Sequence, residues 1–102
     1  MADKKFFVRY LPAAEDDLLG ILDWIAQDSP VRARSFIEKL DKKILLLTHA
    51  PLLGLKSRHA GLDFKGYRIL VVETYLVFYK IVGAVVMIHR VVHGSRDLEG
   101  LV

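Results

Sequence analysis

Apolar residues recur every three or four positions in two neighbouring stretches, which predicts two amphipathic helices. The first stripe lies within "AAEDDLLGILDWIAQDSP" and consists of Leu18, Ile21, Leu22 and Ile25, with Trp24 beside it. The second helix is expected over about residues 30–48, with a stripe of Ala33, Phe36, Ile37, Leu40, Ile44 and Leu47. Ser29 is its expected N-cap and Pro30 its first residue. A connection this short predicts an antiparallel helical hairpin.

The last third of the chain is apolar with few interruptions, and short turns divide it into strands. "YRILVV", "YLVFYKIV" and "VVMIHRVVH" are separated by "ET" and "GA", which suit two-residue hairpins, and Gly83 fits the first position of a type II′ turn. A further strand is expected at about residues 5–10 and should join the same sheet. The order predicts one α+β domain over residues 1–102, with an N-terminal strand, an antiparallel helical hairpin and a three-stranded antiparallel meander. The helices should pack on one face of the sheet.

Two-residue turns would also fix which side chains share a face of the sheet. They pair Arg68 with Tyr79, Tyr79 with Ile88, and Val77 with Arg90. One face then carries Arg68, Leu70, Val72, Tyr75, Val77, Tyr79, Ile88, Arg90 and Val92. The other carries Tyr67, Ile69, Val71, Leu76, Phe78, Lys80, Met87, His89, Val91 and His93. Both faces are heavily apolar and two helices cover only one, so we expect an exposed apolar face that needs a partner.

Composition agrees with a small domain that has a partner. The chain has 102 residues, 53% of them hydrophobic, and a formal net charge of +3. It has no cysteine, which excludes disulfides and thiolate metal sites. No stretch has the length and apolarity of a membrane span or a secretory signal, so a cytoplasmic location is expected.

The end of the last strand, "HGSRD", contains the residue types of a hydrolytic triad, but their spacing argues against one. Residues two apart at a strand end should splay rather than relay a proton. His89 and His93 lie about 13 Å apart by strand rise, so they do not share a metal ion, and no metal or cofactor is expected.

A group of arginines and tyrosines is the better candidate for function. Arg68, Arg90 and Arg96, with Tyr75 and Tyr79, have the chemistry to bind phosphate or carboxylate groups and to stack. Structural ion pairing is the alternative interpretation of these arginines.

Three fragments together resemble the RelE/ParE superfamily of toxins from type II toxin–antitoxin systems, and the ParE branch (plasmid stabilisation proteins) most closely. They are "VRYLPAAEDDLLGILDWIA", "GYRILVV" and "YLVFYKIVGAVVMIHRVVHGSRDLEGLV", in matching order over nearly the whole chain. The resemblance implies a helical hairpin on a curved antiparallel sheet. It also implies a cognate antitoxin that wraps the toxin and covers apolar surface in a hetero-oligomer.

Activity divides within that superfamily: RelE-like members cleave mRNA on the ribosome without a metal, and ParE-like members inhibit DNA gyrase. Arg68 and Arg96 match arginines of the RelE cleft. Where RelE has two lysines this chain has His59 and Gly61, and the C-terminal tyrosine of RelE has no counterpart before Val102. A RelE-like general base and stacking partner are therefore missing, although His59 and His93 are candidate substitutes.

Three hypotheses follow. The leading one is a ParE-type inhibitor of gyrase or another topoisomerase, neutralised by its antitoxin, for which an enzymatic activity is not expected. Its functional surface would include Arg68, His93 and Arg96, with Tyr75, Tyr79 and Arg90 as further candidates. The second is a ribosome-dependent mRNA endonuclease in which Arg68 and Arg96 bind phosphate and His59 or His93 acts as acid or base. The third is an inactive family member that only binds antitoxin.

Overall fold

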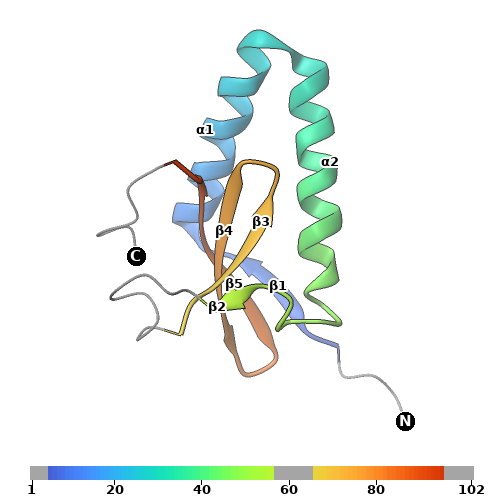
Figure 1. Cartoon of the computed structure of the whole chain (residues 1–102), viewed down its shortest axis with the longest axis vertical. Coiled ribbons are helices and arrows are strands. Elements are labelled where there is room, and N and C mark those ends of the chain that lie inside the picture. Colours follow the sequence, from blue (N-terminus) through green and yellow to red (C-terminus); the bar gives the residue numbers. More distant parts are fainter. Residues whose placement is uncertain (1–4, 57–65, 96–102) are drawn as a thin grey trace.

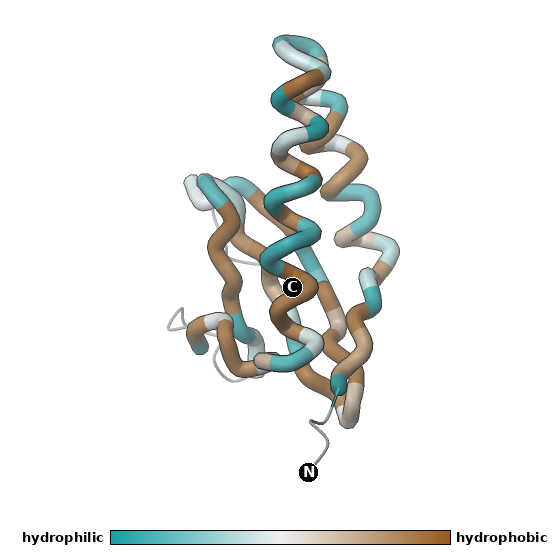
Figure 2. The backbone as a smooth tube through the Cα atoms, turned by 90° about the vertical axis from the view of Figure 1, so that its right-hand side faces the viewer, coloured by the Kyte–Doolittle hydropathy of each residue, from teal (hydrophilic) through white to brown (hydrophobic). Residues whose placement is uncertain are grey.

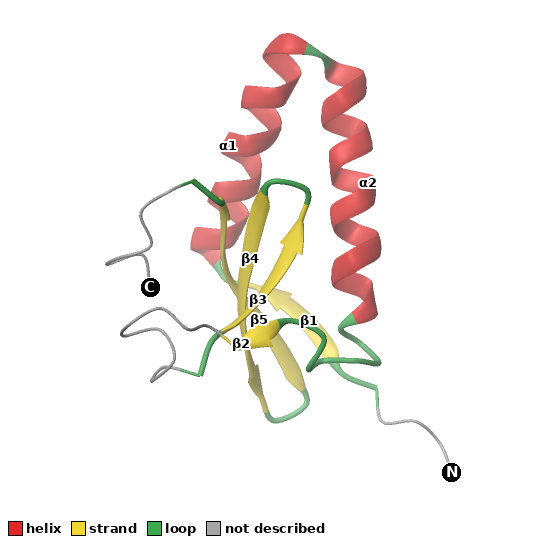
Figure 3. Ribbon diagram, viewed as in Figure 1, coloured by secondary structure: helices red, strands yellow, loops and turns green. Residues whose placement is uncertain are grey.

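The computed structural model describes residues 5–56 and 66–95, where two helices stand side by side over one face of a sheet (Figures 1 and 3). The elements in chain order are β1 (Phe7–Tyr10), α1 (Pro12–Asp28), α2 (Pro30–Leu46), β2 (Leu55–Lys56), β3 (Arg68–Val72), β4 (Tyr75–Val82) and β5 (Val85–His93). The predicted α+β class, helical hairpin and antiparallel meander are confirmed.

The two helices meet at Ser29, where the predicted cap forms. The Ser29 side chain accepts a hydrogen bond from the backbone N–H of Arg32 at 3.2 Å, and Pro30 is the first residue of α2. The α2 stripe points into the core, with Phe36, Leu40 and Ile44 buried. The α1 stripe is only half-buried, because α1 packs against α2 and β5 rather than across the middle of the sheet.

The sheet has the strand order β1-β5-β4-β3-β2, with β1 parallel to β5 and the other neighbours antiparallel. Both predicted two-residue turns are present, since Val72 faces Tyr75 and Val82 faces Val85. Gly83 has a positive φ of 60°, as the turn requires. The N-terminal strand joins the sheet as expected, and β2 is an additional short edge strand.

The predicted register fails in the second half of β5. Tyr79 pairs with Ile88 as expected, but Phe78 pairs with Arg90 and Val77 with Val91, because a β-bulge places one extra residue in β5. The bulge lies where the partner of the outer edge of β5 changes. Up to Ile88 the edge is covered by β1, and beyond it the carboxylate of Asp17 in α1 accepts the N–H of Val91 at 2.9 Å. The assignment of Arg90 and Val92 to the face of Val77, and of Val91 and His93 to the opposite face, was therefore wrong.

Apolar side chains form a cluster on each side of the sheet, and the strands are brown along most of their length in Figure 2. The larger cluster lies under the helices. The smaller one consists of Tyr67, Phe78 and Val92, which are all buried, with Ile69 and Leu76 packed against them. The expectation of an open apolar sheet face is therefore wrong for the middle of that face, where Tyr67, Phe78 and Val92 are buried and the Tyr67 ring lies edge-on to Phe78 at 6.5 Å.

Exposed apolar side chains lie mostly elsewhere, on the helices, on β1 and on the segment before β2. They are Phe7, Leu19, Trp24, Val31, Leu45, Leu46, Leu52, Leu53, Leu55, Val71 and Val82. Neither α1 nor α2 is long and apolar enough to cross a membrane.

Candidate functional cleft between the helical hairpin and the sheet

Two of the predicted site residues, Tyr75 and His93, come together at one end of the sheet. They face each other across β4 and β5, with ring centroids 5.4 Å apart and the rings nearly perpendicular. On its other side Tyr75 packs against Phe36 of α2, at 5.1 Å between centroids. The tyrosine is thus held by the core, and the exposed imidazole of His93 is held by the tyrosine.

His93 is also held from its own chain. Its Nδ1 accepts a hydrogen bond from the backbone N–H of Ser95 at 3.2 Å and lies 2.7 Å from the Ser95 hydroxyl. The expectation that these side chains splay apart was therefore wrong, while Asp97, the third residue of the supposed triad, lies outside the described residues. Since Nδ1 is occupied by this strand-end turn, Nε2 is the nitrogen left to contact a partner.

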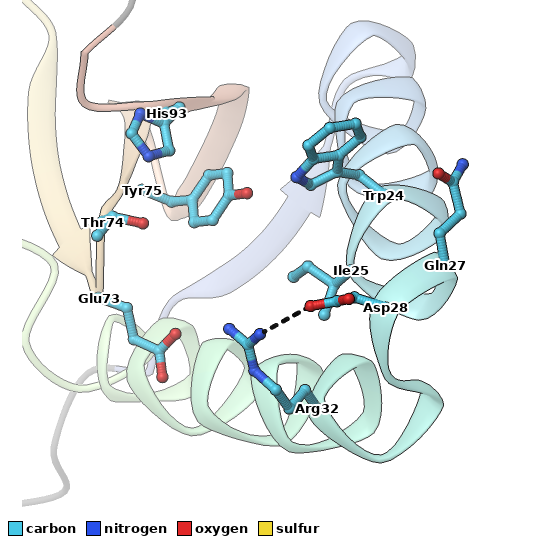
Figure 4. Close-up of a pocket in the computed structure, with 9 residues that line it drawn as sticks. All are labelled: Trp24, Ile25, Gln27, Asp28, Arg32, Glu73, Thr74, Tyr75 and His93. Carbon is cyan, nitrogen blue, oxygen red and sulfur yellow. Dashed lines mark ion pairs between the residues drawn. The ribbon is translucent and has the colours of Figure 1, made fainter.

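The Tyr75–His93 pair forms one wall of a half-open cleft of about 620 Å³ (Figure 4). The helical hairpin forms the opposite wall, and the β3–β4 turn closes one side. The lining residues are Trp24, Ile25, Gln27, Asp28, Arg32, Glu73, Thr74, Tyr75 and His93. Within the described residues, this is where candidate site residues and an exposed aromatic side chain meet.

Trp24 is the functional candidate that sequence reasoning missed. Its side chain is 71% exposed and faces the cleft from α1 (Figure 4). A tryptophan this exposed, beside two further aromatic rings, is typical of an anchor residue in a protein–protein interface. The signal was present in the sequence, because position 24 lies off the apolar stripe formed by Leu18, Ile21, Leu22 and Ile25.

Charged side chains on the rim of the cleft are paired within the chain. Glu73, in the turn between β3 and β4, accepts a hydrogen bond from the Lys39 ammonium at 2.8 Å, and Asp28 lies 3.8 Å from Arg32. Lys43 of α2 donates to the carbonyl of Val71 at 2.9 Å. These contacts are exposed and contribute little stability, but they keep the turn close to α2 and leave the aromatic side chains as the main feature of the cleft.

Arg68 and Tyr79 lie at the opposite end of the sheet, where they hold the segment before β2. The Arg68 guanidinium donates to the carbonyl oxygens of Gly54 at 2.8 Å and Leu52 at 3.3 Å. The Tyr79 side chain is fully buried; its hydroxyl donates to the Pro51 carbonyl at 2.7 Å and accepts the N–H of Gly54 at 2.8 Å. Burial raises the pKa of Tyr79, so the hydroxyl stays protonated as this geometry requires. A buried Tyr79 offers no surface to a partner.

Arg90 forms an ion pair with Asp17 of α1, at 2.7 Å from Nε and 2.9 Å from Nη2. This hydrogen-bonded pairing raises the pKa of Arg90. Because the same carboxylate accepts the Val91 N–H, the pair fastens α1 to the bulged strand. The remaining two candidates, His59 and Arg96, lie outside the described residues.

A second polar group lies on the sheet face opposite the helices. The hydroxyl of Tyr67 is 3.0 Å from Nδ1 of His89, and the ammonium of Lys80 lies 4.4 Å from the Tyr67 ring centroid. Burial, with a smaller contribution from Lys80, lowers the pKa of His89. The imidazole is therefore neutral at physiological pH. Three or more metal-ligating side chains do not gather anywhere in residues 5–56 and 66–95.

Comparisons with known proteins agree on one family of folds. The family model for the ParE toxin of the type II toxin–antitoxin system parDE matches residues 8–98. The structure is similar to one titled as the chromosomal ParDE toxin–antitoxin system from P. aeruginosa, with a TM-score of 0.72, 18% sequence identity, and coverage of 88% of this chain and 97% of that one. It is also similar to a chain of the RelBE2 toxin–antitoxin complex from Mycobacterium tuberculosis, with a TM-score of 0.60, 24% identity, and coverage of 87% and 98%. A comparison with curated proteins gives no match.

Proposed function

The chain belongs to the ParE toxin family of type II toxin–antitoxin systems, and we propose that it acts by binding and inhibiting DNA gyrase or a related topoisomerase. The family makes it the toxin of such a module. Two structurally similar proteins come from toxin–antitoxin systems, which supports an antitoxin as its natural partner.

The separation of Arg68 from His93 supports an inhibitor that binds its target over a nuclease that pairs these two side chains. RNA cleavage needs a phosphate-binding cation and an acid or base within hydrogen-bond reach of the same scissile group. Arg68 pairs with Tyr79, and His93 pairs with Tyr75, which lies four residues earlier in β4. Four residues of strand correspond to about 13 Å, so the side chains of Arg68 and His93 lie at different ends of the sheet. Arg68 is moreover bonded to two loop carbonyls, which supports a structural role.

We assign the cleft of Trp24, Tyr75 and His93 to recognition of the target. Its aromatic side chains and the free Nε2 of His93 suit a protein surface, where a few aromatic anchors supply most of the binding energy. Binding without chemistry requires no general base, which is consistent with the separation of Arg68 from His93.

A gyrase supercoiling reaction and a translating extract, each supplied with purified toxin, test this function. We expect loss of supercoiling and intact mRNA. Codon-linked cuts in mRNA with normal supercoiling would favour the endonuclease hypothesis instead. If supercoiling is normal and mRNA stays intact, the hypothesis of an inactive antitoxin-binding protein is favoured.

A further inference from the structure

The imidazole of His93 is fixed in one tautomer by the residue two positions further along the chain. The backbone N–H of Ser95 donates to Nδ1 at 3.2 Å, and a backbone N–H is always a donor. Nδ1 therefore carries no proton, and the proton of the neutral ring lies on Nε2. The Ser95 hydroxyl, 2.7 Å from the same nitrogen, is then a second donor to it. His93 consequently offers its surroundings a hydrogen-bond donor, the Nε2–H group.

The ring is also fixed in position before a partner binds. It lies nearly perpendicular to the Tyr75 ring, with 5.4 Å between the centroids. The backbone N–H of Gly94 donates to the carbonyl of Thr74 at 2.8 Å, so the end of β5 is fastened to the β3–β4 turn that closes the cleft. Within residues 5–56 and 66–95 no acceptor bonds to the Nε2–H group, and the side chain is exposed. A donor that is already held in place loses little conformational entropy when it meets an acceptor.

The cleft around His93 has no net charge that would attract an ion. Its charged lining residues are Asp28, Arg32 and Glu73, and Glu73 is paired with Lys39. Asp28 lies 3.8 Å from Arg32, so each carboxylate of the lining has a cation beside it. A carboxylate from a partner would therefore lose its water without gaining a cation of its own. An uncharged carbonyl group loses less when it leaves water, so a carbonyl oxygen is the acceptor that this cleft suits.

From these features we propose that His93 determines specificity by donating its Nε2–H to a carbonyl oxygen of the topoisomerase segment that occupies the cleft. Ser95 is the positioning residue that holds this donor in place. Trp24 and Tyr75 contact the apolar part of the same segment from opposite walls (Figure 4). The proposal rests on the proposed inhibition of a topoisomerase for the identity of the partner. It adds the chemistry of the contact, which is a backbone or side-chain amide carbonyl beside an apolar side chain.

The tautomer is tested on the full chain without a partner. Proton–nitrogen NMR spectra at about pH 7.5 separate a protonated from an unprotonated ring nitrogen, and His93→Gln identifies the His93 signals by their loss. We expect the proton on Nε2 and none on Nδ1. A proton on Nδ1, or an equal mixture of the two tautomers, would overturn the proposal whatever the target is.

Inhibition of gyrase supercoiling by purified variants tests the contact itself. Glutamine and glutamate have the same shape, but only the glutamine amide donates hydrogen bonds. We expect His93→Gln to inhibit within about threefold of the wild-type chain and His93→Glu to be at least about tenfold weaker. Equal inhibition by these two variants would overturn the donor role. His93→Lys should inhibit no better than the wild-type chain, and stronger inhibition would overturn the carbonyl in favour of a carboxylate on the target.

The role of Ser95 is tested in two backgrounds. Ser95→Ala removes the hydroxyl donor to Nδ1 and should weaken inhibition at least about threefold, whereas Ser95→Thr keeps the hydroxyl and should recover most of that loss. Ser35→Ala, at an exposed serine of α2, is the matched control and should change inhibition less than about twofold. In the His93→Gln background Ser95→Ala should have no further effect, because it acts through the imidazole. Equal weakening in both backgrounds would overturn the positioning role.

Two controls separate failure of this contact from other failures. Circular dichroism checks that each variant is folded before its inhibition is compared. Failure of the wild-type chain to inhibit supercoiling would refute the proposed function, and the contact to the target with it. Inhibition by the wild-type chain, with His93→Glu as strong as His93→Gln, would refute only the contact.

Discussion

Gly54→Ala should destabilise the protein by several kcal/mol, because the Tyr79 side chain occupies the space of the added methyl group. A Cβ at position 54 would lie 2.6 Å from both Cε1 and the hydroxyl of Tyr79, and 2.9 Å from the carbonyl oxygen of Ile69. Tyr79 is fully buried and has no room to withdraw. Overpacking of this kind costs about 1–3 kcal/mol. Displacing the ring also weakens the Tyr79 hydrogen bonds to Pro51 and Gly54, at about 1 kcal/mol for each one lost.

The expected total of about 2–4 kcal/mol corresponds to a fall of about 1–2 M in the urea unfolding midpoint. Gly20→Ala is the matched control, since nothing lies within 4 Å of a Cβ at that position in α1. There the same substitution should stabilise the protein by about 0.5–1 kcal/mol, because alanine loses less backbone entropy in a helix. An unchanged midpoint for Gly54→Ala would refute the view that Arg68 and Tyr79 hold the segment before β2 in place.

Three further predictions concern the other polar contacts. Asp17→Asn should lower the free energy of unfolding by about 2–3 kcal/mol, because it weakens the bonds to Arg90 and Val91; Asp16→Asn, at an exposed neighbour, should change urea unfolding little. His89 has a lowered pKa in the folded state, so the unfolded state binds more protons just below pH 6.5 and stability falls as the pH drops. His89→Asn should reduce that loss in urea titrations at about pH 7.5 and 5.5, and an unaltered slope would contradict the assignment. Burial, with a contribution from Asp41, raises the pKa of Tyr10 to about 12, so its contribution to stability should be lost as the pH rises above 10. Tyr10→Phe should remove a tyrosinate absorbance step near pH 12; persistence of that step would show that another tyrosine produces it.

Local patterns were sufficient to predict most of the fold. The Ser29 cap, the α2 stripe and the two-residue turns at residues 73–74 and 83–84 depend on neighbouring residues, and each is present. The register of β5 depends on Asp17, which is more than seventy positions away in the chain. Its carboxylate accepts the N–H of Val91 at the edge of β5, beyond the part of that edge that pairs with β1. Alternation along β5 carries no information about that contact, so the bulge was not predictable.

The candidate site also combines features that neighbouring residues determine with features that depend on residues distant in the chain. Tyr75 and His93 meet because a short turn fixes β4 and the strand beyond the bulge brings His93 opposite Tyr75. The residue type of Arg68 suggested phosphate binding, but its partners are the carbonyls of Leu52 and Gly54, in a segment without the periodicity of a helix or a strand. Trp24 was predictable in part, from its position off the apolar stripe of α1.

The most direct test of the account is inhibition of gyrase supercoiling by the wild-type chain and by Trp24→Ala. Val31→Ala, which truncates an apolar residue on α2 that is 75% exposed, is the control for loss of exposed apolar surface. We predict that the wild-type chain and Val31→Ala inhibit supercoiling, that Trp24→Ala is at least about tenfold weaker, and that the antitoxin restores supercoiling. Undiminished supercoiling at saturating wild-type toxin, together with cleavage of mRNA in a translating extract, would contradict the account.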